Sequence, residues 1–367
     1  MNLVPTLHHG ARHMKPHVLG FLLLFGCVDG VEESTGEAEL GARCPPFACG
    51  STSNSPEIDN LGLHDLILGR ENATGFTLLW FEKNGRKYER VRVERATLIA
   101  TDNAGVAPPG GIAGGALRVS HKSGAVYLLR FREPSTTAYW AQRPNVWART
   151  RSVTQLIQWV TIDKNHPIGG TPPQVGWTNV CTNPPTNPDE TLGMTWTHAV
   201  VFEHDVIDAE TLRVTGLDSM RFNIGCAGHA LAKLHLSGHT QGAAAQGFAT
   251  TQAQRTTFLK MITADYCGTG DPFTVAGQPL NWTDSRGWMR YASNNPTLEA
   301  RWTEHGATCL NTPRVVAHPT PEATELFGDT NAEFNAAIAE ICPRPRPCVG
   351  DDFAKHHILS ANPAPLL

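Results

Sequence analysis

The nine cysteines carry the most versatile chemistry in this sequence, because a thiol can be acylated, oxidised to a disulfide or bound to a metal. Cys27 stands apart from the others, directly after an apolar run that ends with Gly26. The other eight are spread along the rest of the chain: Cys44, Cys49, Cys181, Cys226, Cys267, Cys309, Cys342 and Cys348. Which chemistry applies depends on the compartment that the chain occupies.

The segment before Cys27 has the pattern of a secretory signal peptide. Lys15 supplies a basic start, and the apolar run over residues 18–25 has about 8 residues, whereas a membrane-spanning helix needs roughly 20. We therefore predict a signal peptide over residues 1–26. No later apolar stretch in the sequence has the length of a membrane span.

Leu24, Phe25, Gly26 and Cys27 resemble the bacterial lipobox, in which a small residue precedes a cysteine that is lipidated and becomes the mature N-terminus. The resemblance implies lipid on Cys27, a membrane as partner, and a place in the cell envelope at the periplasmic or surface face of the outer membrane. Residues 27–60, which are acidic and rich in Gly, Ser and Pro, are then a lipidated tether. The alternative is an ordinary cleaved signal peptide with an unmodified Cys27.

The charge of the remaining chain argues against a nucleic-acid partner. Removal of residues 1–26 takes away Arg12 and Lys15 and no acidic residue, so the net charge changes from −4 to −6. Binding to phosphates needs a basic face, and the sequence has no dense run of Lys and Arg. We expect no nucleic acid, and envelope glycans or proteins are the candidate partners.

In an oxidising compartment, eight cysteines predict four disulfides. Cys44 lies close to Cys49 and Cys342 close to Cys348, with prolines between them that favour small loops, so both pairs are expected to close locally. The other four leave three connectivities open: Cys181, Cys226, Cys267 and Cys309. Zinc at Cys44 and Cys49 is the alternative, but the second close Cys or His pair that it needs does not follow nearby.

The sequence lacks two common catalytic motifs. It has neither the G-x-S-x-G pentapeptide of serine hydrolases nor the H-E-x-x-H of zinc hydrolases. His229, His235 and His239 are clustered, and we interpret them as surface or capping histidines, with zinc as the alternative. A triad of Asp265, His305 and a nearby serine is a further alternative. We predict no catalytic residue, no metal and no cofactor.

Tryptophans are frequent in the region 61–220. They are Trp80, Trp140, Trp147, Trp159, Trp177 and Trp196. Such rings stack on sugars in some proteins, but more often they fill the core of a β fold.

Alternation of apolar and polar residues predicts strands over the region 61–220. Asn84 and Gly85 form a two-residue turn between alternating segments at 76–80 and 88–93, which predicts a β-hairpin. Further strands are predicted at 117–119, 126–131, 152–161, 198–204 and 211–214.

Helical spacing appears only later in the chain, at residues 227–236, 251–264 and 330–341. Thr330 and Glu333 form a capping box for the last helix, and Pro343 stops it. The expected fold is therefore α+β. A mainly antiparallel β part over 61–220 precedes a smaller disulfide-stapled helical region over 221–314, and a C-terminal helix with an unstructured tail follows over 315–367.

One tetrapeptide, formed by Ala264, Asp265, Tyr266 and Cys267, resembles the motif that names the bacterial ADYC domain family. Its surroundings are similar to that family as well, in the residues Cys226, Ala230, Lys233, Glu299, Ala300, Arg301, Trp302, Gly306, Ala307 and Cys309. The resemblance covers about residues 221–314 and, more loosely, the β-rich part before them. It implies a secreted or lipid-anchored bacterial protein of no established activity.

The motif residues themselves favour a structural role. They lie where a helix ends and a Gly-Thr-Gly turn begins, so Asp265 can cap the turn, Tyr266 can cover the core and Cys267 can staple the helix end. A thiolate is disfavoured at the C-terminal end of a helix, which makes Cys267 a disulfide partner rather than a nucleophile. The resemblance further implies that Leu234 and Phe258, where many members carry cysteines, pack together.

The function expected from these observations is a non-catalytic binding or structural role in the cell envelope. The alternative is a hydrolase acting on envelope polymers, which are peptidoglycan, polysaccharide or protein.

Overall fold

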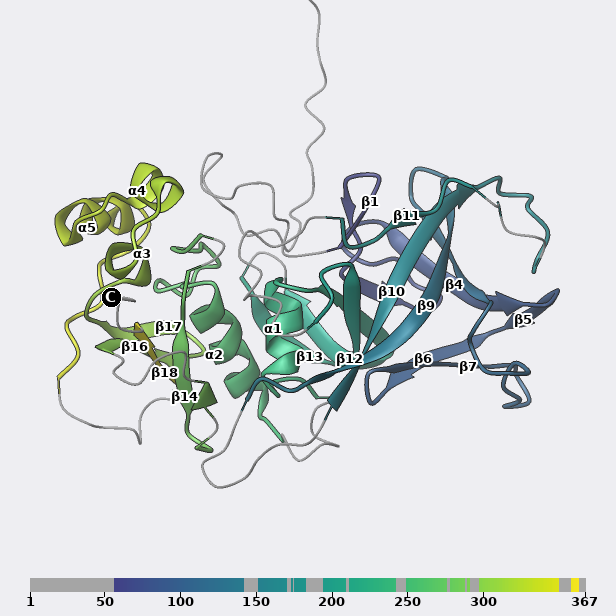
Figure 1. Cartoon of the computed structure of the whole chain (residues 1–367), viewed down its shortest axis with the longest axis horizontal. Coiled ribbons are helices and arrows are strands. Elements are labelled where there is room, and N and C mark those ends of the chain that lie inside the picture. The colour runs from purple at the N-terminus through teal and green to yellow at the C-terminus, as the bar shows by residue number, and fades with distance from the viewer. Residues whose placement is uncertain are drawn as a thin grey trace, which may run out of the picture. The chain divides into compact units, whose positions relative to one another are not determined.

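Antiparallel β-sheet dominates the part of the chain that the structure describes (Figure 1). This structure, a computed structural model, describes residues 56–141, 151–169, 173, 175–182, 194–208, 211–241, 249–275, 278–287, 289–290, 297–349 and 358–362. The predicted signal peptide, Cys27, and Cys44 with Cys49 lie outside these ranges. Within them, no helix is both long enough and apolar enough to span a bilayer.

The largest sheet has nine strands, with β11 beside β10 and the other eight in the order β3-β13-β12-β10-β9-β8-β4-β5. Their bounds are β3 (Asp65–Ile67), β4 (Phe76–Lys83), β5 (Arg86–Tyr88), β8 (Ala116–His121), β9 (Val126–Ala138), β10 (Arg151–Ile162), β11 (Thr178–Asn179), β12 (His198–Asp208) and β13 (Arg213–Cys226). The strands predicted from alternation at 117–119, 126–131, 152–161 and 198–204 all belong to this sheet.

The first predicted hairpin is confirmed up to Tyr88 and wrong beyond it. Asn84 and Gly85 have φ angles of 51° and 72°, as their turn requires, and β5 pairs with β4. The chain then starts a separate hairpin of β6 (Arg90–Glu94) and β7 (Thr97–Thr101). Its turn residues Arg95 and Ala96 have positive φ, and the Glu203 carboxylate accepts the N–H of Arg95 at 2.9 Å. This long-range acceptor has no local sequence signal.

The β6–β7 hairpin and the large sheet share one apolar core. Val91 and Val93 of β6 are buried in the same cluster as Phe76, Leu117 and Ile157 of the sheet. A short hairpin of β1 (Glu57–Ile58) and β2 (Leu61–Gly62) also contributes, because Ile58 is fully buried in this cluster. The predicted tether thus overlaps a folded strand at its C-terminal end.

Strand β12 separates this core from a second one. Ala199 and Val201 point into the first core, whereas Val200 and Phe202 point into the second. A strand buried on both faces reads as a continuous apolar run, which is what residues 199–202 show. Helix α1 (Ala230–Leu236) covers the second face so closely that a Cβ on Gly225 of β13 would lie 2.6 Å from the Ala232 nitrogen.

All helices of the described chain follow residue 229, after the strands of the large sheet. They are α1, α2 (Gln252–Ile262), α3 (Arg314–Ala317), α4 (Pro321–Phe327) and α5 (Asn331–Ala339). The predicted capping box of Thr330 and Glu333 is present, and Thr251 forms another with Gln254. Leu234 and Phe258 are both fully buried in the second core, where α1 packs against α2, and their direct contact stays a prediction.

The expected helical region also contains a five-stranded antiparallel sheet that the sequence reasoning missed. Its order is β15-β14-β18-β16-β17, with β14 (Asn281–Asp284), β15 (Met289–Arg290), β16 (Thr297–Thr303), β17 (Gly306–Leu310) and β18 (Ile358–Asn362). Strand β18 lies in the tail that was expected to be unstructured, and it is the central strand of the sheet. Its pairing partners are distant in sequence, so local composition does not reveal it.

Candidate functional site

The Ala-Asp-Tyr-Cys motif begins where α2 ends. Ala264 is fully buried with φ +53°, the left-handed conformation that usually favours glycine. The Asp265 N–H donates to the Lys260 carbonyl at 2.8 Å, and the Ala264 N–H donates to the Met261 carbonyl at 3.1 Å. These two bonds form a Schellman cap, which satisfies the last carbonyls of the helix and turns the motif into the core.

Asp265 is a buried capping residue, as its position predicted. Its Oδ1 accepts the Thr269 N–H at 3.1 Å, and its Oδ2 accepts the Gly270 N–H at 2.8 Å. Oδ2 also lies 2.5 Å from Lys260 Nζ, and both side chains are fully buried. Burial raises the pKa of Asp265 and lowers the pKa of Lys260, while their mutual attraction opposes both shifts.

Tyr266 lies in a buried polar and aromatic cluster. Its ring stacks on Trp302 at 5.2 Å, and its hydroxyl donates to Glu299 Oε1 at 2.5 Å. The guanidinium of Arg314 donates to the same carboxylate at 2.8 Å and to the Met261 carbonyl of α2 at 2.8 Å. Burial raises the pKa of Tyr266 well above its ordinary value. The cluster joins the helix end, β16 and α3 through groups that are fully desolvated.

The motif also touches the β16–β17 hairpin through its backbone. The Ala307 N–H donates to the Tyr266 carbonyl at 3.0 Å. Gly306 has φ +104°, and a Cβ there would lie 2.7 Å from the Gly268 nitrogen. Glycine at 306 therefore permits the close approach of the hairpin to the motif.

Three disulfides connect the described chain: Cys181–Cys226, Cys267–Cys342 and Cys309–Cys348. The expected disulfide at Cys267 is confirmed, but the expected local bond between Cys342 and Cys348 is wrong. The three prolines among the five residues between them keep that segment extended, so its ends reach two different partners.

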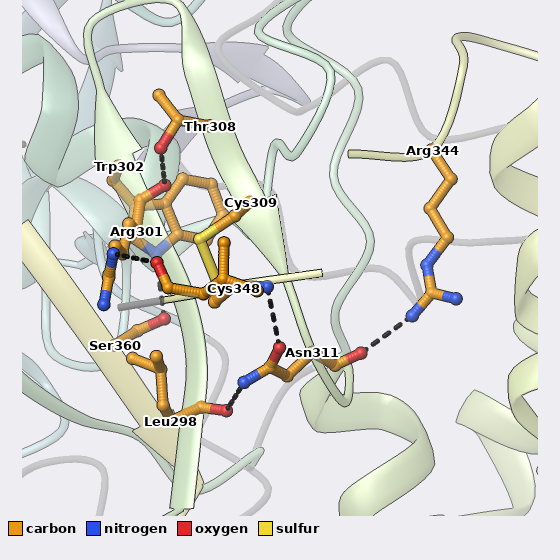
Figure 2. Close-up of a disulfide and its surroundings, with 10 residues drawn as sticks. Leu298, Arg301, Trp302, Thr308, Cys309, Asn311, Arg344, Cys348 and Ser360 are labelled. Carbon is orange, nitrogen blue, oxygen red and sulfur yellow. Dashed lines mark hydrogen bonds between the residues drawn. A yellow bond between two sulfur atoms is a disulfide. The ribbon is translucent and has the colours of Figure 1, made fainter. Parts of the chain in front are cut away.

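Residues 342–349, which we term the Pro-Arg strap, lie beside the end of the edge strand β17. Figure 2 shows Cys348 of this strap bonded to Cys309 of β17 and hydrogen-bonded to Asn311. The Arg346 carbonyl accepts the Leu310 N–H at 2.9 Å, and the Cys348 N–H donates to Asn311 Oδ1 at 2.9 Å. Arg344 donates to the Asn311 carbonyl at 2.7 Å. Between its two disulfides the strap is thus held by one backbone–backbone hydrogen bond and by two hydrogen bonds to Asn311.

The interpretation of the clustered histidines as surface or capping residues is wrong for His235 and His239, which are both fully buried. His229 is partly buried and lies at the N-cap of α1, where its side chain makes no capping hydrogen bond. His235 Nε2 lies 2.7 Å from Ser152 Oγ, and its Nδ1 lies 3.0 Å from Thr240 Oγ1. Burial lowers the pKa of His235 to about 3, so the ring stays neutral. His239 stacks on Phe258 at 4.3 Å. Because apolar side chains surround the two rings, sequence periodicity could not separate them from exposed histidines.

The proposed triad of Asp265 and His305 is not assembled. The oxygens of Asp265 are bonded to Lys260 and to backbone N–H groups, whereas the His305 ring is 71% exposed beside Glu304. In the described ranges, no group of three His, Cys, Asp or Glu side chains is arranged to hold a metal ion.

The tryptophans of the β-rich part are mostly covered. Lys87 Nζ lies 4.2 Å from the centre of the Trp80 ring, and the Arg130 guanidinium lies 3.9 Å from that of Trp177. Trp140 is buried, and Trp196 is 40% exposed. Trp159 is partly buried and packs against Tyr127, whereas Trp147 lies outside the described residues. Rings already covered by cations are occupied on one face, which limits stacking on sugars.

The fold and the site define a mainly antiparallel β protein that is cross-linked by disulfides and organised around a buried Ala-Asp-Tyr-Cys motif. The profile of the ADYC domain family matches residues 116–316, and the chain belongs to that family. The match is broader than the expected range of 221–314 and includes strands β8 to β13. No curated protein and no solved structure matches the chain.

Sequence reasoning missed the partners of the motif. Lys260 and Arg314 were not singled out, and Glu299 entered only as part of the family resemblance. A charged residue within a run of consecutive apolar residues, as at Lys260 in the run 258–262, is the one signal that could have indicated a buried ion pair.

Proposed function

We propose that this chain is an exported lipoprotein that lipid on Cys27 anchors in the outer membrane, and that it has a non-catalytic binding or structural role in the cell envelope. The observation that carries the export proposal is the set of three disulfides, which join cysteines 39 to 75 residues apart. Such bonds persist in oxidising compartments and are rare in the cytosol. The tether over residues 27–60 and the helical region stapled by disulfides belong to the same proposal.

The non-catalytic role is supported by what the family motif does. Asp265 caps a turn, Tyr266 is bonded to Glu299 inside the core, and Cys267 is in a disulfide. Each of these side chains is engaged in holding elements together, so the motif stabilises a scaffold that carries its binding surface elsewhere. Envelope glycans or proteins are the proposed partners.

The anchor is tested by metabolic labelling with palmitate. Label is expected on the wild type and on Cys44→Ser, a control that removes another cysteine close to the signal peptide. The Cys27→Ser variant should carry none, because the acyl chains have no other site. Because the acyl chains supply the membrane affinity, the unlipidated variant should either be released from the membrane fraction or stall there with its signal peptide uncleaved. Label that persists on Cys27→Ser, or its absence from the wild type, would exclude the anchor.

A hydrolase acting on envelope polymers is the second candidate, and one observation favours it: Ser152 Oγ lies 2.7 Å from His235 Nε2. Two others oppose it, since both residues are buried and His235 is a weak base with a pKa of about 3. We expect a fluorophosphonate probe to leave Ser152 unlabelled. Labelling of the wild type that disappears in Ser152→Ala would instead favour the hydrolase.

A further inference from the structure

Lys260 and Asp265 differ chemically from the other fully buried ion pairs of the described chain. Those pairs use either arginine, whose guanidinium stays protonated and is a poor nucleophile, or histidine, whose imidazole has no primary amine: Arg118–Glu82, Arg255–Asp205, Arg314–Glu299, His64–Asp65 and His239–Asp284. A lysine amine that loses its proton is a nucleophile, and a protonated aspartate carboxyl is an electrophile that can donate its acyl group to that amine. Only this buried pair therefore has the two groups from which an amide can form.

The two side chains are held close to the geometry of attack. Nζ of Lys260 lies 2.5 Å from Oδ2 of Asp265. The carboxyl carbon lies one bond beyond Oδ2, which brings it near the separation of roughly 3 to 3.5 Å that reacting atoms have in near-attack conformers. Carbonyls of Thr211 and Gly268 also accept from Nζ and fix its position.

The backbone also supplies donors for the charge that develops during attack. The Thr269 N–H points at Oδ1 at 3.1 Å, and the Gly270 N–H points at Oδ2 at 2.8 Å. When Oδ2 is the oxygen that departs, the oxyanion of the tetrahedral intermediate develops on Oδ1, where the preorganised Thr269 N–H stabilises it in a site that excludes water, while the Gly270 N–H holds Oδ2 in place.

Burial favours the two reactive protonation states. It lowers the pKa of Lys260 and raises the pKa of Asp265, so transfer of one proton along their hydrogen bond gives a neutral amine and a neutral acid. Attraction within the ion pair opposes this transfer. An amide would remove both buried charges, and with them the desolvation cost that a buried ion pair carries.

We infer that Lys260 and Asp265 condense into an intramolecular amide cross-link after the chain has folded. The lysine ammonium first gives one proton to the carboxylate. Nζ then attacks the carboxyl carbon, a second proton moves from nitrogen to the departing Oδ2, and one water leaves. The Nζ–Cγ bond forms as the Cγ–Oδ2 bond breaks, and the amide nitrogen keeps one hydrogen. No oxidant, reductant or other reactant is needed.

The cross-link is tested in the full-length protein by tryptic digestion and mass spectrometry after reduction and alkylation. Trypsin should not cut after Lys260, because its amine is acylated. Residues 256–286 should therefore appear as one peptide, about 18 Da lighter than its sequence mass, and its fragmentation should give no backbone ions between positions 260 and 265. A sample kept in urea from synthesis onward should show the ordinary peptides, since the reaction depends on the fold.

The Lys260→Arg variant retains the positive charge and cannot form the amide, so its peptides should have their sequence masses and be cut after residue 260. Lys83→Arg is the matched control, because Lys83 is also buried but donates to the carbonyls of Pro109 and Gly111, and there the cross-link should persist. Cleavage after Lys260 in the folded wild type overturns the inference. The same mass loss with Lys260 still cut would place a succinimide at Asp265 and would also overturn it.

Discussion

The two cores of this protein are held together in different ways. Around the first core, strands as long as the 14 residues of β13 pair along most of their length, and one disulfide, Cys181–Cys226, joins its parts. Around the motif, the longest strand has seven residues and the longest helix has 11, and two disulfides and several buried charges connect them. A long strand pair is stabilised by many backbone hydrogen bonds, so each one contributes a small share of the stability. Short strands and helices depend on a few disulfides and buried ion pairs, so removal of one of these should lower the unfolding free energy more.

The largest expected effect comes from Arg314, the centre of the buried charge cluster. Arg314→Met would leave the Glu299 carboxylate buried without its counter-ion, and the loss of one partner of a buried pair costs about 3 to 5 kcal/mol. The loss of unfolding free energy is measured by chemical denaturation, with circular dichroism as the signal. Arg346→Met is the control, because this side chain is exposed on the strap and its replacement should change the unfolding free energy by less than about 0.5 kcal/mol. Equal effects of the two variants would mean that the cluster is not structurally special.

The second prediction compares disulfides of the two cores. Removal of Cys267–Cys342 by alanine at both positions should lower the unfolding free energy by about 3 kcal/mol. Chain entropy alone predicts a similar loss for Cys181–Cys226, because the loops of 75 and 45 residues differ little on a logarithmic scale.

Hydrogen exchange separates the two disulfide variants. Without Cys267–Cys342, the amides of α5 and the strap should lose protection. Without Cys181–Cys226, the β10–β12 ladder should keep its protection, because its own hydrogen bonds remain. If both variants lost protection equally in the affected regions, the two cores would not differ in how strongly they depend on their disulfides.

The third prediction concerns acid. The unfolded chain binds a proton on His235 near pH 6.5, whereas the folded protein resists this until the pKa of about 3. Below pH 6.5 the unfolded state therefore gains protons that the folded state does not, and stability falls by about 1.4 kcal/mol per pH unit, or about 2 kcal/mol at pH 5. His64, fully buried in the first core, has a pKa lowered to about 3 and should add the same loss.

The acid effect is measured as the slope of unfolding free energy against pH between 6.5 and about 4. His235→Phe should reduce that slope by one proton even if the variant is less stable at neutral pH. Phe202→Leu is its control, because it removes the ring stacked on His235 and keeps the titrating group. An unchanged slope in His235→Phe would contradict the assignment.

The smallest effect is expected at Ala264. A left-handed conformation costs an alanine about 1 kcal/mol relative to glycine, but Ala264→Gly also removes a buried methyl worth about 0.8 kcal/mol. The two contributions nearly cancel, so the unfolding free energy measured by chemical denaturation should change by less than about 1 kcal/mol in either direction. A larger change would show that the Schellman cap, or the packing of that methyl, contributes more than its local chemistry suggests.

The features that were predicted correctly from the sequence depend on residues that are close together in the chain. The turn at Asn84 and Gly85 and the capping box at Thr330 depend on residues within a few positions, and the structure contains both. The role of Cys267 followed from its place at a helix end. The prediction of a local disulfide between Cys342 and Cys348, made because the two lie close in the sequence, was wrong. The prolines between them keep the segment extended instead of bending it into a small loop.

The remainder of the site depends on long-range contacts. Glu299 lies 33 residues from Tyr266 and 15 from Arg314, and no local periodicity links them. Strand β18 is recognisable only beside β14 and β16, which flank it. His235 and Ser152 are 83 residues apart. Local patterns in a sequence contain no signal for such pairings, so the buried clusters could be located only in the folded chain.

The Pro-Arg strap has a consequence for assembly. Successive residues of an extended chain direct their N–H and C=O groups to opposite sides. Arg346 and Cys348 use theirs toward β17 and Asn311, so the prolines at 343, 345 and 347 lie at the outward-facing positions. Proline has no N–H to offer a further strand. The strap thus terminates the five-stranded sheet at β17 and blocks the edge-to-edge pairing with a second copy to which an open edge strand is prone.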